Sequence, residues 1–170
     1  LILATDMLNL PVFQALIKPS CPVAIYFHEN QFTYPWSPND ADVELQRDKH
    51  YGFINYSSAL SADHIYFNST FHLNSFFTGL EDFLRQFPDY REIQNIEVLK
   101  KKCDVLYLGM DLKKFDEYKT KEQLQGPPLI LWNHRWEHDK NPEGFFNVLE
   151  LLSNKGVEFQ LAVLGKDYKK

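Results

Sequence analysis

The chain has 170 residues, of which 44% are hydrophobic and 15% aromatic, and its formal net charge is −5. This composition excludes a disordered chain, and the acidic balance excludes a broad positive surface for nucleic acid. A chain of this length has room for one domain or for two incomplete ones.

The sequence predicts a protein that is neither exported nor embedded in a membrane. It has no run of about 18 apolar residues and no signal-peptide pattern. Cys21 and Cys103 have no partner at metal-ligand or redox spacing, which is typical of a reducing compartment. Two glycosylation sequons, Asn55-Tyr-Ser57 and Asn68-Ser-Thr70, point the other way, but such triplets arise often by chance. We therefore expect a cytoplasmic protein, with the nucleus as a second location.

The first part of the chain alternates apolar strand patterns with helical patterns. Predicted strands cover residues 1–5, 23–27, 64–67 and 104–108. Predicted helices cover residues 10–17, about 39–60 with Asn39 or Asp40 as the cap, 71–87 and about 91–102. The helix at 71–87 carries a core stripe, and His72, which lies between the members of that stripe, is predicted to face solvent. This alternation predicts an α/β fold with a parallel sheet.

Four consecutive polar residues directly follow the predicted strand at 23–27, namely His28, Glu29, Asn30 and Gln31. Ligands of parallel sheets bind beyond the carboxyl ends of the strands, so this position favours a ligand-binding loop. If His28 is considered by itself, a structural role is as plausible as a catalytic one. The four residues together favour the functional interpretation.

A polar segment at residues 117–127 has the composition of a linker, and the strand pattern restarts after it. An apolar run at 129–132 leads into a polar loop at 133–141, a helix that begins at Pro142, and a second apolar run at 159–164. Asn141 can cap that helix, and Gly156 is typical of a helix end. Strand, helix and strand in this order predict a βαβ unit.

The loop at 133–141 holds two cations, Arg135 and Lys140, just ahead of the predicted helix. Free amides and the helix dipole favour an anion at a helix start, and a guanidinium with an ammonium group would complete a site for a diphosphate. The alternative is that both side chains are solvated loop charges. Their position at the ligand-binding edge of the sheet favours the diphosphate site.

The same loop contains His134-Arg-Trp-Glu137-His138, which matches the H-x-x-E-H signature of a class of zinc peptidases. That signature requires a helix, on which residues four apart share a face and both imidazoles reach one metal. Here the segment follows a strand and precedes the helix, so we predict no metal site. Nor does the sequence contain a G-x-S-x-G, Walker or G-x-G-x-x-G motif. Two α/β halves with polar edge loops suit a transferase that holds a nucleotide-activated donor.

Four passages resemble the retaining nucleotide-sugar transferases of the GT-B fold: HEN at 28–30, ADHIYFNS at 62–69, VLYLGMDLKKF at 105–115 and ILWNHRWEHDKNPEGF at 130–145. The resemblance implies two Rossmann-like parallel-sheet domains, both incomplete in this chain. With the bounds set by the linker composition, the resemblance implies a partial acceptor-side domain at 1–116, a linker at 117–127 and a partial nucleotide-sugar-binding domain at 128–170. The family's Gly-rich first loop and its late acidic pair have no counterpart here, which indicates a fragment of a larger protein.

Three passages are closer still to one branch, the tRNA-queuosine mannosyltransferases: HENQFTYP, YGFINYSSAL and LWNHRWEHDKNP. This resemblance implies transfer of mannose from GDP-mannose to the queuosine of tRNA, with retention at the sugar carbon and without a metal or cofactor. The missing parts of the fold leave an alternative open. The chain could be a catalytically inactive fragment that binds a nucleotide sugar or acts as a scaffold.

The resemblance also implies roles for individual residues. Arg135 and Lys140 would grip the diphosphate of GDP-mannose, and His28 and Glu29 would approach the reacting sugar and the acceptor. The donor loop would further supply Asn133, His134 and Asn141. The acceptor side would be lined by Asn30, Gln31, Tyr51, Asn55 and Ser69.

Overall fold

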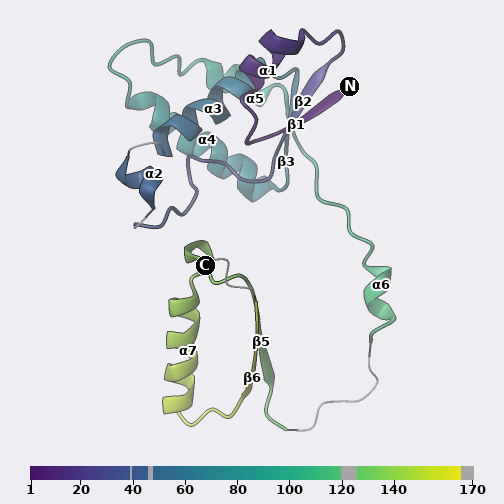
Figure 1. Ribbon diagram of the computed structural model, residues 1–170, viewed down its shortest axis with the longest axis vertical. Helices are drawn as coiled ribbons and strands as arrows, with labels where there is room; N and C mark the ends of the chain where they lie inside the picture. Colours follow the sequence, from purple (N-terminus) through teal and green to yellow (C-terminus); the bar gives the residue numbers. More distant parts are fainter. Residues whose placement is uncertain (39, 46–47, 120–125, 166–170) are drawn as a thin grey trace. The chain divides into compact units, whose positions relative to one another are not determined.

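The computed structural model describes residues 1–38, 40–45, 48–119 and 126–165 (Figure 1). The chain divides into two compact units, one formed by residues 1–34 and 38–109 and the other by 35–37 and 110–170. Both units contain parallel strands and helices, which confirms the predicted α/β class. The predicted linker at 117–127 includes residues outside the described part of the chain, and it stays a prediction.

The first unit is built on a parallel sheet of four strands in the order β1-β2-β3-β4. These strands are β1 (Ile2–Thr5), β2 (Val23–Phe27), β3 (His64–Phe67) and β4 (Cys103–Val105). The register pairs Ile2 with Val23, Ala24 with His64 and Ile65 with Cys103. Because neighbouring strands run parallel, their carboxyl ends lie at one edge of the sheet.

Helices connect these strands (Figure 1). They are α1 (Leu10–Ile17), α2 (Ala41–Glu44), α3 (Asp48–Ser61), α4 (Thr70–Arg85) and α5 (Asn95–Lys100). All five residues of β2 are buried, as expected for a strand inside a parallel sheet. The rings of Phe27, Phe67 and Phe76 lie 5.0–5.3 Å apart in the core. Burial of each such ring contributes about 1.5–3 kcal/mol.

Three predicted boundaries in this unit are wrong. The helix predicted at 39–60 is two helices, α2 and α3, because residues 41–47 supply only Val43 and Leu45 to an apolar stripe. The cap of α2 is Asp40, whose side chain accepts from the amide of Asp42, whereas Asn39 lies outside the described residues.

The helix predicted at 91–102 begins only at Asn95, because Tyr90 and Glu92 have positive φ angles that a helix does not accommodate. The strand predicted at 104–108 is shorter, since its partner β3 ends at Phe67. The amide of Leu106 still donates to the carbonyl of Phe67, at 2.9 Å. Beyond that bond, the described part of the chain offers no further β3 residue with which this segment could pair.

The second unit contains the predicted βαβ arrangement. Strands β5 (Leu129–Asn133) and β6 (Gln160–Leu164) pair in parallel, and α7 (Pro142–Asn154) connects them. Trp132 is buried and lies 4.7 Å from the ring of Phe145 on α7. A short 3-10 helix, η1 (His138–Lys140), precedes α7, and α6 (Lys113–Asp116) lies earlier in the chain.

The predicted boundaries of α7 are confirmed. The side chain of Asn141 accepts a hydrogen bond from the amide of Gly144 at 3.2 Å, and Pro142 occupies the first turn. At the other end, Gly156 has a φ of +75° and its amide donates to Ser153. Among the helices that the structure describes, none combines the length and apolar character needed to cross a bilayer.

Candidate functional site

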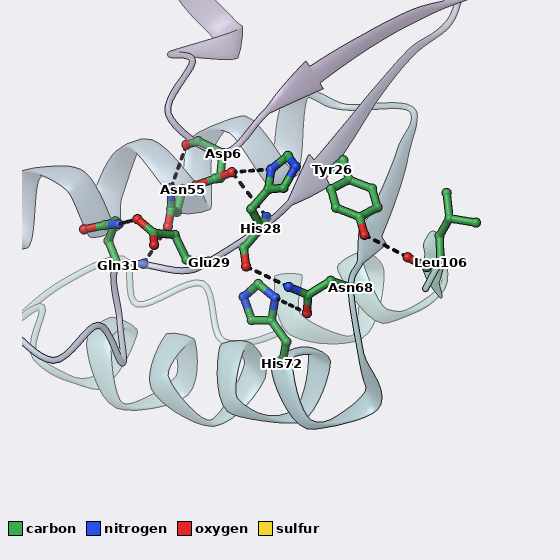
Figure 2. A network of polar contacts seen from close by, with 9 residues as sticks. All are labelled: Asp6, Tyr26, His28, Glu29, Gln31, Asn55, Asn68, His72 and Leu106. Carbon is green, nitrogen blue, oxygen red and sulfur yellow. Dashed lines mark hydrogen bonds and ion pairs between the residues drawn. The ribbon is translucent and has the colours of Figure 1, made fainter. Parts of the chain in front are cut away.

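A polar network lies at the carboxyl edge of the four-stranded sheet (Figure 2). Asp6 follows β1, His28 follows β2, and Asn68 follows β3, so three neighbouring strands each deliver one polar residue to the same edge. This is the position at which parallel sheets bind ligands. The prediction of a polar loop at His28 identified the middle member of this set.

Asp6 holds His28 from the β1 side. The carboxylate oxygen Oδ1 accepts from the backbone amide of His28 at 3.2 Å and lies 3.3 Å from Nδ1 of its ring. Asp6 is only 3% exposed, whereas the His28 side chain is 52% exposed. The His28 ring also packs at 4.8 Å against the ring of Tyr26. One edge of the imidazole is thus fixed, while the side chain as a whole remains open to solvent.

Asn68 holds His28 from the β3 side. Its Nδ2 donates to the backbone carbonyl of His28 at 2.8 Å, and its Oδ1 accepts from the hydroxyl of Ser69 at 3.1 Å. Where the strands end, side chains from both neighbouring strands therefore bond the backbone of His28. This arrangement continues the hydrogen bonding of the sheet by one residue and fixes the backbone that carries the imidazole.

His72 is the fourth polar member of the network, and its predicted exposure is wrong. It is 7% exposed, with Nδ1 at 3.2 Å from Oδ1 of Asn68 and its ring edge-on to Phe67 at 5.3 Å. Burial lowers its pKa, and the smaller effect of His28 acts in the same direction, against that of Asp6. His72 is therefore neutral at pH 7. Its Nε2 is buried without a hydrogen-bond partner among the described residues.

Asn30 and Gln31 shape the loop that carries His28 and Glu29. Oδ1 of Asn30 accepts from the backbone amides of Phe32 and Thr33 at 3.2 and 3.1 Å, which closes a tight turn. Nε2 of Gln31 donates to Oε1 of Glu29 at 3.3 Å. Both Asn30 and Gln31 are buried, whereas Glu29 is exposed. The structure thus presents His28 and Glu29 outward on a turn that their two neighbours hold.

Asn55, Ser69 and Tyr51 take supporting places in this structure. Asn55 is fully buried on α3, where Oδ1 accepts from the amide of Gln31 at 2.8 Å and Nδ2 donates to the carbonyl of Asp6 at 3.0 Å. Ser69 caps α4 by accepting from the amide of His72. The hydroxyl of Tyr51 donates to Asp42 at 3.4 Å. Their contacts with substrate stay predictions.

The two sequon asparagines, Asn55 and Asn68, are thus structural. In each, the side-chain nitrogen to which a glycan would be attached donates to a backbone carbonyl, of Asp6 and of His28 respectively. The structure supplies a role for both asparagines that is independent of glycosylation.

Phe32 belongs to the loop that follows β2, and its side chain packs between α3 and α4, which holds that loop in place. Its ring lies 5.2 Å from that of Phe76 and 5.3 Å from that of Phe83. Glycines on the two helices face it: a Cβ added at Gly79 would lie 2.6 Å from Cβ of Phe32, and one added at Gly52 would lie 3.3 Å from its ring. The absence of side chains at these two positions is what admits the aromatic residue.

In the second unit, both predicted diphosphate-binding cations are paired with carboxylates of their own loop. Nη2 of Arg135 lies 3.0 Å from Oε2 of Glu137, and Nζ of Lys140 contacts Oδ2 of Asp139. Arg135 remains 54% exposed, so its pairing is a surface ion pair and not a buried one. An incoming diphosphate would compete with these two carboxylates for the same cations.

The remaining residues of this loop lie around the start of α7. Asn133 ends β5 and is exposed, and the exposed His134 has its ring edge-on to Trp132 at 5.3 Å. Asn141 caps α7. Gly165, which follows β6, has a φ of +140°, and an added Cβ there would lie 2.2 Å from the carbonyl oxygen of His134. Only glycine fits where the end of β6 meets this loop.

The H-x-x-E-H segment lacks the helix on which the zinc-peptidase signature depends. Residues 134–137 are not helical, so His134 and His138 do not share the helix face that the signature requires. Across the ranges that the structure describes, no group of three or more His, Cys, Asp or Glu side chains could hold a metal ion.

Comparisons with known proteins decide the family. A sequence model of the N-terminal part of tRNA-queuosine alpha-mannosyltransferases matches residues 1–110. The chain belongs to the tRNA-queuosine alpha-mannosyltransferase family. The tRNA-queuosine alpha-mannosyltransferase of Drosophila melanogaster is 37% identical over 157 residues, which cover 88% of this chain and 40% of that protein. The chain therefore spans less than half the length of this relative. No solved structure matches the chain.

In this member of the tRNA-queuosine alpha-mannosyltransferase family, residues 1–110 contain the whole network around His28. The donor loop at 133–141 lies beyond that match. Sequence reasoning missed Asp6, Asn68 and His72 as members of the network. The available signal was the same one that identified His28, since Asp6 and Asn68 each directly follow an apolar strand.

Proposed function

We propose that the protein transfers mannose from GDP-mannose to the queuosine of tRNA, with retention at the sugar carbon, as a glycosyltransferase of the GT-B fold. Membership of the tRNA-queuosine alpha-mannosyltransferase family is the observation that carries this proposal. The two edge loops, one in each α/β unit, support it. We place the reaction in the cytoplasm, with the nucleus as a second location.

The donor side of the proposal rests on the loop between β5 and α7. Its two cations, Arg135 and Lys140, stand ahead of a helix start that Asn141 caps. Transfer of the sugar breaks the bond between its anomeric carbon and the diphosphate, which gains negative charge as it leaves. Cations and amide dipoles fixed in advance stabilise this charge, and loss of one such contact typically costs about 3 kcal/mol of barrier.

The acceptor side of the proposal rests on His28 and Glu29. Asp6 and Asn68 fix the backbone at His28, and the imidazole is half exposed at the ligand-binding edge. A hydroxyl of the acceptor must give up its proton as its oxygen bonds the anomeric carbon. An imidazole or carboxylate within hydrogen-bond reach can orient that hydroxyl and accept its proton.

The test is incubation of the protein with labelled GDP-mannose and tRNA that contains queuosine. We expect label to enter the tRNA as an α-mannoside, and to stay out of tRNA that carries guanosine in place of queuosine. We also expect transfer to continue in a chelator. If GDP-mannose binds and no label is transferred, the inactive fragment is the correct assignment. Other nucleotide sugars, offered in parallel, test the donor.

Substitution of Arg135 distinguishes between two hypotheses, namely that its side chain binds the diphosphate and that it is a solvated loop charge. We expect Arg135→Ala to lower turnover by more than about a hundredfold, because the leaving diphosphate loses a charged contact. Arg91→Ala, which removes an arginine from the surface of the other unit, provides the matched control. Near-normal turnover of the Arg135→Ala enzyme would remove Arg135 from the donor site.

A further inference from the structure

Asp6 is a buried carboxylate whose contact with the imidazole ring of His28 has no part in the proposed function so far. It follows β1, is 3% exposed, and directs Oδ1 to two nitrogens of one residue, the backbone amide and ring Nδ1 of His28 (Figure 2). Buried carboxylates are kept only where hydrogen bonds offset the cost of removing them from water. Here the partner that offsets this cost is the histidine at the ligand-binding edge.

The contact determines which nitrogen of the ring carries the proton. While its carboxylate is ionised, Asp6 can only accept hydrogen bonds, and Nδ1 at 3.3 Å then acts as the donor. In the neutral imidazole, Nε2 is then left with a free lone pair. The same carboxylate oxygen holds the backbone amide of His28, so ring and main chain are oriented by one group.

We propose that Asp6 is a positioning residue for the transfer reaction, which holds His28 with its proton on Nδ1 and leaves Nε2 as the acceptor for a hydroxyl of the substrate. This role rests on the proposed function, because it requires His28 to meet the acceptor or the sugar. The orientation itself does not depend on catalysis and can be measured without substrate. Asp6 acts through His28 and need not contact the substrate.

The chain supplies a matched control for this proposal. Asp63 accepts from the backbone amide of Val23 at 2.8 Å, through Oδ2, at the opposite end of the same strand β2. Asp6→Asn and Asp63→Asn thus make the same chemical change, each at a carboxylate that holds a backbone amide next to or within β2. Asp6 contacts an imidazole nitrogen, at 3.3 Å, whereas the contact used here for Asp63 is with a backbone amide.

The first experiment records two-bond correlations between ring protons and nitrogens in the ¹⁵N-labelled protein, at a pH where His28 is neutral. His28→Gln assigns the signals. We expect Nδ1 to have the shift of a protonated nitrogen and Nε2 that of an unprotonated one. In Asp6→Asn this pattern should be lost, because the amide group can offer its own N–H to the ring. It should persist in Asp63→Asn.

A proton on Nε2 in the unsubstituted protein overturns the proposal, even if Asp6→Asn does not fold. An unchanged pattern in folded Asp6→Asn overturns it as well. The second experiment measures transfer: we expect Asp6→Asn to lower kcat about tenfold to a hundredfold, with little change in KM for either substrate. A rise in KM at unchanged kcat would contradict the positioning role. If the unsubstituted protein transfers no mannose but shows the expected tautomer, the proposed function fails and the orientation by Asp6 stands.

Discussion

At the scale of single residues, the donor loop carries its own counter-charges. Glu137 pairs with Arg135 and Asp139 pairs with Lys140, so the four charges of the loop sum to zero before any ligand arrives. Surface ion pairs of this kind are weak, typically about 0.2–1 kcal/mol, and a diphosphate offers a stronger partner. If the loop binds the proposed donor, its carboxylates would therefore lower the affinity without preventing binding.

Removal of one counter-charge should strengthen donor binding. We predict that Glu137→Gln tightens the binding of GDP by about twofold to fivefold, because Arg135 no longer has to leave a carboxylate. Isothermal titration at low ionic strength measures the effect. Glu150→Gln, on the exposed side of α7, is the control and should bind GDP unchanged. Equal or weaker binding by Glu137→Gln would show that Arg135 does not meet the diphosphate.

His72 gives the protein a pH dependence of stability. Burial lowers the pKa of His72 in the folded state below its unfolded value of about 6.5, so the unfolded chain binds more protons as the pH falls. The neutral form therefore stabilises the fold fully above about pH 6.5, and this contribution is lost as the pH falls towards the lower, folded pKa.

We predict that His72→Gln flattens the decline in stability below about pH 6.5, by up to about 1.4 kcal/mol per pH unit, which is the limit for one proton. Urea unfolding at several pH values measures this slope. His50→Gln, which removes an exposed histidine from α3, is the control and should keep the slope of the unsubstituted protein. The hypothesis fails if the slopes of His72→Gln and the unsubstituted protein coincide.

At the scale of secondary-structure elements, the position of the His28 loop depends on how closely α3 and α4 approach it. Gly79 on α4 faces Cβ of Phe32, and a methyl group there would require the loop or the helix to move. Alanine would otherwise favour a helix over glycine by about 1 kcal/mol. The direction in which Gly79→Ala changes the stability therefore shows whether the steric clash or the gain in helical propensity is larger.

We predict that Gly79→Ala destabilises the protein by about 1–3 kcal/mol, because a 2.6 Å contact with Cβ of Phe32 is not relieved by rotating a side chain. Thermal unfolding measures the loss. Gly109→Ala is the control, since an added Cβ there meets nothing within 4 Å, and its effect should stay within about 0.5 kcal/mol. A more stable Gly79→Ala protein would mean that the loop with Phe32 moves away from α4 at little cost.

Elements were predictable where one local pattern decides them. The apolar stripe, Asn141 and Gly156 gave α7 its bounds, and four consecutive polar residues marked the loop at His28. The boundary errors arose where tertiary structure decides, as at β4, which ends where its partner ends. The contact between Asp6 and His28 could not be predicted for the same reason. It spans 22 residues and exists because β1 pairs with β2, which periodicity does not show.

At the scale of the whole molecule, the division into two units follows the family comparison closely. The first unit extends to Gly109, and the match to the N-terminal part of the family covers residues 1–110. Its core includes all four strands of the larger sheet and the helices α1, α3, α4 and α5. The sequence-based boundary at 116 and the linker at 117–127 remain to be tested in solution.

We predict that limited proteolysis cleaves the chain first within residues 117–127, because polar linkers between compact units offer accessible backbone. Mass spectrometry of the early products should show a stable fragment that ends in this range. Initial cleavage inside residues 48–109 would instead place the weakest part of the chain in the first unit.

The hydrogen bonds of the amide nitrogens of Asn55 and Asn68 have a practical consequence for production of the protein. A secretory host attaches oligosaccharide to a growing polypeptide before such hydrogen bonds form. A sugar at Asn55 could not be accommodated in a fully buried position, and one at Asn68 would displace the bond to the carbonyl of His28. Material made through the endoplasmic reticulum would thus be impaired around the His28 loop, and bacterial expression avoids this damage.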